Sequence, residues 1–147
     1  MDLASDVTSI AHVIQLSIAP VFLLTAVGAM LGVLSSRLSR AVDRARTLEG
    51  RVKTATDAEP SILLGRQLTA LGRRIRIIYS AMVLCAVCAL LICSVIVIAF
   101  ASTLAGAVLA VPIAVLFIGA MLAFIGALLL FLREVHIAIT TLHIDTP

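Results

Sequence analysis

Residues 77–132 read IIYSAMVLCAVCALLICSVIVIAFASTLAGAVLAVPIAVLFIGAMLAFIGALLLFL. This stretch contains no Asp, Glu, Lys or Arg, and residues 7–36 form a second stretch without a charged side chain. A helix that crosses a bilayer needs about 20 predominantly apolar residues, so the shorter stretch accommodates one span and the longer one accommodates two. The sequence therefore predicts an all-α integral membrane protein with three transmembrane helices, over residues 8–36, 77–101 and 108–132.

The composition agrees with a membrane protein. Hydrophobic residues make up 62% of the chain and charged residues 13%, whereas charged residues are about 25% of a soluble globular domain. We therefore expect lipid to be the main solvent of this chain, and we interpret residues 1–147 as a single membrane domain.

The basic residues are distributed unevenly. All but one of the 11 Lys and Arg residues lie within residues 37–76. Because loops rich in Lys and Arg remain in the cytoplasm, we expect residues 37–76 and the tail 133–147 to be cytoplasmic and the N-terminus to lie outside. The start of the chain carries Asp2 and Asp6 and no basic residue, so we do not expect a cleaved signal peptide there.

Two amphipathic patterns occupy the basic segment. Apolar residues recur at spacings of three and four in residues 37–53, and Leu64, Leu68, Leu71, Ile75 and Ile78 repeat at heptad spacing. The polar segment 54–60, which ends in proline, indicates a turn. We therefore predict that the first helix, beginning near Asp6 or Thr8, and the second helix both extend beyond the membrane and form a cytoplasmic helical hairpin over residues 37–76.

The outer connection and the tail are less strongly patterned. We expect the outer connection near residues 102–106, with Pro112 early in the third span, where a missing N–H is tolerated. Residues 135–144 alternate too loosely to define a fold, although their apolar residues would allow them to lie along the membrane surface.

One face of the first helix changes from polar to small and apolar and then to basic. At 100° per residue, this face contains Thr8, His12, Gln15, Ala19, Ala26, Val33, Arg37, Arg40, Arg44 and Arg51. In a homo-oligomer such a face could line a pore for ions. The alternative, which we favour, is that the polar residues hydrogen-bond within the subunit while the arginines are solvated or contact anionic lipid.

Small residues predict close helix packing. Gly28 and Gly32 form a Gly-x-x-x-Gly pair on roughly the opposite face of the first helix. Comparable small faces occur on the second and third helices, at Ala81, Cys85, Ala89, Cys93, Gly119, Ala123 and Gly126. The three cysteines all lie in the second span, where we favour packing over a redox or zinc role because an aqueous, electropositive setting is missing.

Two further features have alternative interpretations. Pro20 lies inside the first span, where it either acts as a hinge or is an ordinary membrane-helix proline. Arg73, Arg74 and Arg76 lie where the second helix should enter the inner leaflet. We expect these arginines to contact lipid headgroups, and not nucleic acid, because no nucleic-acid-binding module accompanies them.

Catalytic and metal-binding patterns are weak. His136 and His143 would share a helix face near Glu134, but a metal site needs three or four converging ligands. No phosphate-binding loop, nucleophile–histidine pair or paired intramembrane carboxylate is present in the sequence. We therefore expect no enzyme activity, metal or cofactor.

Three segments carry a resemblance to a known family. They are residues 14–24 (IQLSIAPVFLL), 37–46 (RLSRAVDRAR) and 130–135 (LFLREV). Taken in order, they resemble an uncharacterised bacterial membrane family, domain-of-unknown-function family 2721, over nearly the whole chain. The resemblance implies a bacterial inner-membrane protein with three spans. It carries over no catalytic or binding residue, and it implies that the shared role lies around Pro20 and residues 37–46.

Three hypotheses about function follow. The first is a non-enzymatic homo-oligomeric membrane protein held together by the small residues and the hairpin. The second is a homo-oligomeric ion channel with the first helix lining the pore. The third is a scaffold or accessory subunit whose hairpin docks a cytoplasmic protein.

Overall fold

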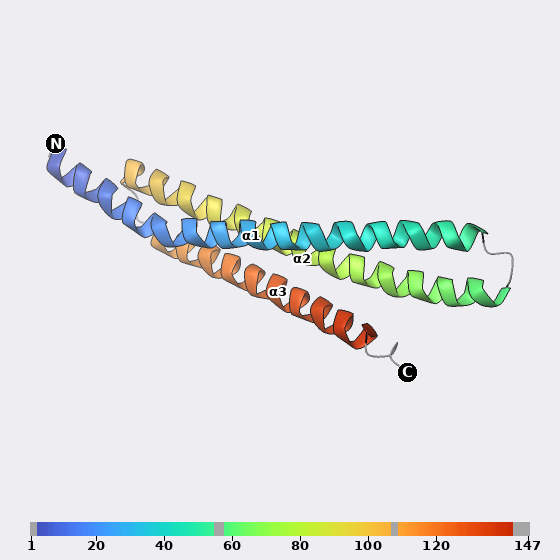
Figure 1. Ribbon diagram of the computed structural model, residues 1–147. Coiled ribbons are helices and arrows are strands. Elements are labelled where there is room, and N and C mark those ends of the chain that lie inside the picture. The colour runs from blue at the N-terminus through green and yellow to red at the C-terminus, as the bar shows by residue number, and fades with distance from the viewer. Residues whose placement is uncertain (1–2, 55–57, 107–108, 143–147) are drawn as a thin grey trace. The chain divides into compact units, whose positions relative to one another are not determined.

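The computed structural model describes residues 3–54, 58–106 and 109–142. They form three helices, α1 (Leu3–Thr54), α2 (Ala58–Ala105) and α3 (Ala110–Leu142), and no strand occurs among these residues (Figure 1). All three helices are long and apolar enough to cross a membrane. The prediction of an all-α chain with three helices capable of spanning a bilayer is therefore confirmed.

The starts of α1 and α2 differ in detail from the expectation. α1 begins at Leu3, earlier than the expected Asp6 or Thr8, and it continues without a break through Pro20. α2 begins at Ala58, so Pro60 lies in its first turn and not in a turn between helices. Proline is tolerated there because the first N–H groups of a helix have no partner within the helix.

The second helix also continues further than expected at its other end. The hydroxyl groups of Ser102 and Thr103 both donate to the carbonyl of Ala99, over 2.8 and 3.1 Å. These polar side chains are thus satisfied within the helix, and α2 reaches Ala105. Gly106 follows with φ of 63°, a left-handed conformation that commonly ends a helix and that glycine adopts without a steric penalty.

The segment after the third span is helical. α3 continues without interruption from the apolar stretch to Leu142, so residues 133–142 belong to the same helix as the span. The sequence left the fold of this tail open. The structure shows the reason for the continuation, because Glu134 in this segment is buried and must remain in register with the residues that it contacts.

The chain forms two compact units, to both of which every helix contributes. Unit 1 contains Met1–Met30 and Leu84–Ile125, and unit 2 contains Leu31–Val83 and Gly126–Pro147. The fully buried side chains of unit 1 include Val27, Cys85, Cys88 and Ile92. Those of unit 2 include Leu34, Ile78, Ala127 and Glu134.

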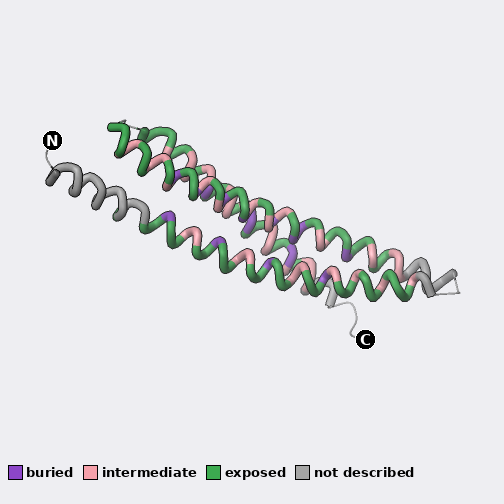
Figure 2. The backbone as a smooth tube through the Cα atoms, turned by 90° about the horizontal axis from the view of Figure 1, so that it is seen from above, coloured by how far each residue is buried: buried purple, intermediate pink, exposed green. Residues whose placement is uncertain are grey.

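Buried residues recur every seven positions along each helix. Figure 2 shows the buried sites as short segments along largely exposed or half-buried tubes. The series are Pro20, Val27, Leu34 and Ala41 on α1, Leu71, Ile78, Cys85 and Ile92 with Ala81, Cys88 and Val95 on α2, and Ala120, Ala127 and Glu134 on α3. A seven-residue repeat drifts by only about 20° around an α-helix, so it maintains one narrow seam along a long helix.

This repeat differs from the small-residue spacing expected on α2. Ala81 and Cys85 are buried, but Ala89 is half-buried and Cys93 is exposed. Steps of four residues advance by about 40° each around the helix, so a series of four such positions leaves the seam. On α3 the buried small residues are Ala120 and Ala127, whereas Gly119, Ala123 and Gly126 are half-buried beside them.

Large apolar side chains outside the seam are exposed. Phe22, Leu104 and Val111 are 72%, 88% and 75% exposed. Such a surface would be unfavourable in water but is suited to lipid tails. The chain is therefore a multi-pass membrane protein, and the exposed apolar surface is the part that the bilayer covers.

Candidate functional site: an ion triad beside an arginine-lined cleft

In unit 2, three charged side chains, one from each of the three helices, meet at a single point. Arg37 follows the buried Leu34 of α1 by three residues, and Arg74 follows the buried Leu71 of α2 by the same interval. A spacing of three keeps a side chain on the same side of a helix as its predecessor. Both arginines consequently lie next to the seam, although each is separated from Glu134 by a long stretch of sequence.

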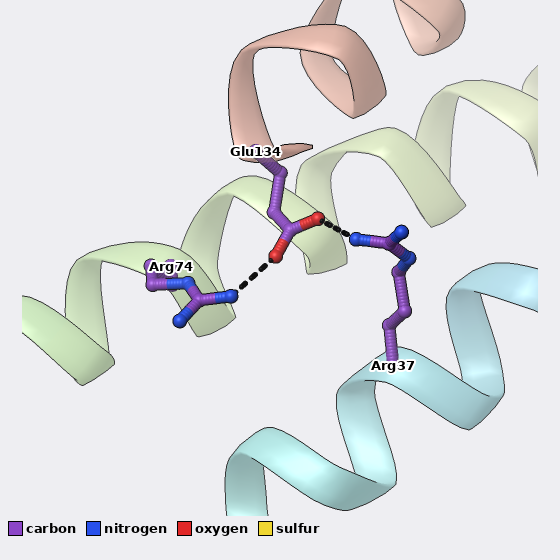
Figure 3. Close-up of polar contacts among 3 residues, drawn as sticks. All are labelled: Arg37, Arg74 and Glu134. Carbon is purple, nitrogen blue, oxygen red and sulfur yellow. Dashed lines mark hydrogen bonds and ion pairs between the residues drawn. The ribbon is translucent and has the colours of Figure 1, made fainter. Parts of the chain in front are cut away.

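Glu134 joins the two arginines (Figure 3). The Nη1 group of Arg37 donates to Oε2 of Glu134 over 2.6 Å, and the Nη2 group of Arg74 donates to Oε1 over 2.8 Å. Each carboxylate oxygen therefore accepts from a different helix. We call these three residues the ion triad.

The ion triad has a buried anion and two partly exposed cations. The side chain of Glu134 is 2% exposed, and those of Arg37 and Arg74 are 30% and 28% exposed. An isolated buried carboxylate is strongly unfavourable, so these two charged donors are what allows Glu134 to occupy the seam. The guanidinium carbon of Arg37 also lies 5.0 Å from the centroid of the Phe131 ring, within the range of a cation–π interaction.

The ion triad marks where the apolar stretches of the three helices end. Arg37 is the first charged residue after residues 7–36, Arg74 lies just before the uncharged stretch 77–132, and Glu134 lies just after it. Since the three side chains contact one another, these ends are at one level within unit 2. The ion triad therefore marks one common end of the uncharged stretches of α1, α2 and α3.

A cleft of about 360 Å³ lies beside the ion triad. It is lined by Arg37, Arg40, Ala41, Arg44, Leu71, Arg74 and Glu134. Four guanidinium groups thus surround the cleft with one carboxylate between two of them. Arginine stays protonated in proteins, so the lining has an excess of positive charge at any physiological pH.

Several donors along this cleft lack a partner. Among the described residues, Arg40 and Arg44 are exposed and make no ion pair or hydrogen bond. The Nε atom of Arg74 is buried and has no hydrogen-bond partner within the same part of the chain. Buried donors are normally satisfied, so an unpaired one beside a cleft is a feature that a bound acceptor would explain.

The sequence profile of a family described as "Protein of unknown function (DUF2721)" matches residues 17–144. The chain belongs to the DUF2721 family. The matched range contains the whole ion triad and all four arginines of the cleft. No curated protein and no solved structure matches this DUF2721 chain.

The residues expected to line a pore fall into three groups: exposed residues, one half-buried residue, and residues whose side chains are not described. Gln15, Ala19, Ala26, Val33, Arg40, Arg44 and Arg51 are exposed. Arg37 is half-buried and contacts Glu134, a contact that neither interpretation of this face included. The side chains of Thr8 and His12 lie outside the described residues.

The glycines expected to pack against other helices of the DUF2721 chain are uncovered. Gly28 and Gly32 are exposed, and a Cβ atom built on either would meet no heavy atom within 4 Å. Gly119 is different, because a Cβ there would lie 3.7 Å from the Cδ1 atom of Leu91 in unit 1. The helix packing expected at Gly28 and Gly32 therefore requires a partner other than the described part of this chain.

Other expected positions are placed as follows. Arg73 and Arg76 are exposed and available to headgroups, whereas Arg74 belongs to the ion triad. Pro20 is buried within continuous α1, and its role as a hinge stays a prediction. Among the described residues no three His, Cys, Asp or Glu side chains gather as metal ligands, and His143 lies outside them.

Sequence reasoning did not identify the ion triad. It assigned Arg37 to a pore-lining face and Arg74 to lipid headgroups, and it considered Glu134 only as a weak metal ligand. A signal was present in the seven-residue series, because Glu134 continues the positions of Ala120 and Ala127. A charged residue at a seam position requires a partner of opposite charge on a neighbouring helix.

Proposed function

We propose that this DUF2721 member is a non-enzymatic membrane protein that assembles with copies of itself through α1. The observation that supports this proposal is the open space around Gly28 and Gly32. Lipid tails are as apolar as leucine, so membrane helices associate through close packing at small residues and not through the hydrophobic effect. Two uncovered glycines four residues apart provide such a surface for a second helix.

The polar residues beside these glycines do not prevent close approach. The hydroxyl of Thr25 donates to the carbonyl of Val21 over 3.2 Å, and that of Ser36 donates to the carbonyl of Gly32 over 3.1 Å. These hydroxyls are satisfied within α1, so a neighbouring helix is not required to supply a partner. This face of α1 therefore has small side chains at its centre, and its hydroxyl groups already have hydrogen-bond partners.

The test is the mass of the full-length protein in detergent after Gly28→Leu and Gly32→Leu are introduced together. Because a Cβ at either position meets nothing within the described chain, the substitutions should leave the subunit fold intact and reduce the oligomer to smaller species. Ala114→Leu is the matched control, since Ala114 is also exposed, on α3. An unchanged oligomer in the double variant would contradict the proposal.

A second candidate is the homo-oligomeric channel, and the exposure of Gln15 favours it. Gln15 is a polar side chain exposed within the uncharged stretch of α1, and in an oligomer it would meet its copies or water. We expect Gln15→Leu or Arg40→Glu to alter conductance or ion selectivity in a reconstituted bilayer. A wild-type protein that conducts none of the tested ions would exclude the channel. Docking of a cytoplasmic protein by residues 37–76 stays a third hypothesis.

A further inference from the structure

The cleft of unit 2 combines features of an anion-binding site. Arg37, Arg40, Arg44 and Arg74 line it, and Glu134 supplies the single negative charge. Glu134 is in direct contact with Arg37 and Arg74, whereas Arg40 and Arg44 form no ion pair with any described residue. An anion that enters the cleft would therefore supply a counter-charge to Arg40 and Arg44.

Glu134 also fixes the position of two of the four guanidinium groups. Each guanidinium has five N–H donors, and the carboxylate accepts from one nitrogen of Arg37 and one of Arg74. The remaining donors are held in place without being used up by Glu134. A binding group that is already ordered loses less conformational entropy when its ligand arrives.

The chemistry and the location indicate a phosphate group. Planar guanidinium groups donate pairs of hydrogen bonds that match the oxygens of phosphate. The ion triad places the cleft where the uncharged stretches end. A spanning helix leaves the lipid tails where its apolar stretch ends, and basic pockets between membrane helices near the headgroups bind anionic lipids. The cleft volume of about 360 Å³ lies within the range of small-molecule sites.

We propose that this cleft binds a phosphate-bearing anion, either the phosphodiester of an anionic lipid headgroup or free inorganic phosphate, with Arg40 and Arg44 as the residues that contact it and with Arg37 and Arg74 positioned by Glu134. The Nε atom of Arg74, a residue that lines the cleft, is buried without a hydrogen-bond partner among the described residues. This binding does not depend on the oligomeric state proposed above.

The experiment uses the delipidated full-length protein in a neutral detergent. Two probes are titrated separately, phosphatidylglycerol in mixed micelles and inorganic phosphate. The reference is zwitterionic phosphatidylcholine, whose phosphodiester is balanced by its own ammonium group. The cleft variant is Arg40→Gln with Arg44→Gln. The matched control is Arg46→Gln with Arg66→Gln, which removes the same charge from exposed arginines that do not line the cleft.

We expect the cleft variant to weaken binding of the effective probe about tenfold or more, because each basic residue near a headgroup contributes about 1 kcal/mol. The control variant should bind nearly as the wild type does. Arg40→Lys with Arg44→Lys should retain part of the affinity, since the charge remains while the planar donor arrangement is lost.

The outcomes separate the sources of the phosphate. Binding of phosphatidylglycerol alone supports a lipid headgroup site, and binding of both probes supports a site for the phosphate group itself. Equal weakening in the cleft and control variants would overturn the proposal, because net surface charge would explain it. Absence of binding to both probes would overturn it as well. A melting temperature equal to that of the wild type verifies folding, and the single Arg44→Gln variant provides the same test if the double variant unfolds.

Discussion

The Nη1 group of Arg37 lies 2.6 Å from Oε2 of Glu134, which connects α1 to α3 across 97 residues of sequence. Arg74 of α2 contacts the other carboxylate oxygen, so one buried side chain of α3 is bonded to both of the other helices. The surrounding seam contains mostly small or apolar residues. The ion triad therefore aligns the helices of unit 2 along their axes in a way that apolar contacts alone do not, because apolar contacts are non-directional.

Removing the charge of Glu134 should destabilise the protein. Glu134→Gln leaves two arginines beside the seam without a carboxylate, and we expect the free energy of unfolding to fall by about 1–3 kcal/mol. The arginines are about 30% exposed, so water recovers part of the lost interaction. Unfolding by titration with SDS measures the change. Glu49→Gln, at an exposed position of α1, is the control, and an equal effect at Glu49 would contradict a special role for Glu134.

Replacing the whole ion triad with leucine should be less damaging than breaking it. A variant with Arg37→Leu, Arg74→Leu and Glu134→Leu leaves no unpaired charge at the seam, and apolar replacements of buried ion pairs are often neutral or stabilising. We expect it to melt at a higher temperature than Glu134→Gln. If the triple variant melts lower than Glu134→Gln, the triad contributes net stability beyond the pairing of its own charges.

The seam predicts which apolar residues support the fold. Ile92 is fully buried in unit 1, whereas Leu90 on the same helix is 69% exposed. Ile92→Ala should lower the free energy of unfolding by about 2–5 kcal/mol through the cavity that it leaves, and Leu90→Ala should have little effect because lipid refills the space. Equal losses for the two variants, measured in lipid nanodiscs, would show that Leu90 also packs against protein.

The charge distribution predicts the orientation in the membrane. With native cysteines replaced by alanine, Glu49→Cys places a thiol at an exposed position in the basic segment. A membrane-impermeant maleimide added to intact spheroplasts should not label this thiol, and labelling should appear after the membrane is broken, because basic segments remain in the cytoplasm. Labelling of intact spheroplasts would show that the basic segment lies outside, which contradicts the predicted orientation.

The three long helices were predictable because their signal is local. The uncharged stretches 7–36 and 77–132 satisfy a length requirement that the bilayer imposes on each helix separately. The small-residue faces do not coincide with the buried positions. A spacing of four on α2 includes the buried Ala81 and Cys85 and the exposed Cys93, whereas the buried positions along each helix recur every seven residues.

The sequence by itself determined that this chain is helical, that three of its helices can cross a membrane, and that its basic residues gather in the segment 37–76. These properties depend on hydrophobicity and charge along single segments, which can be counted without knowing the neighbours. Only the tertiary structure decided that Arg37 and Arg74 meet Glu134 and that Gly28 and Gly32 remain uncovered. Those results depend on which face of each helix meets the others, and packing between segments distant in sequence selects that face.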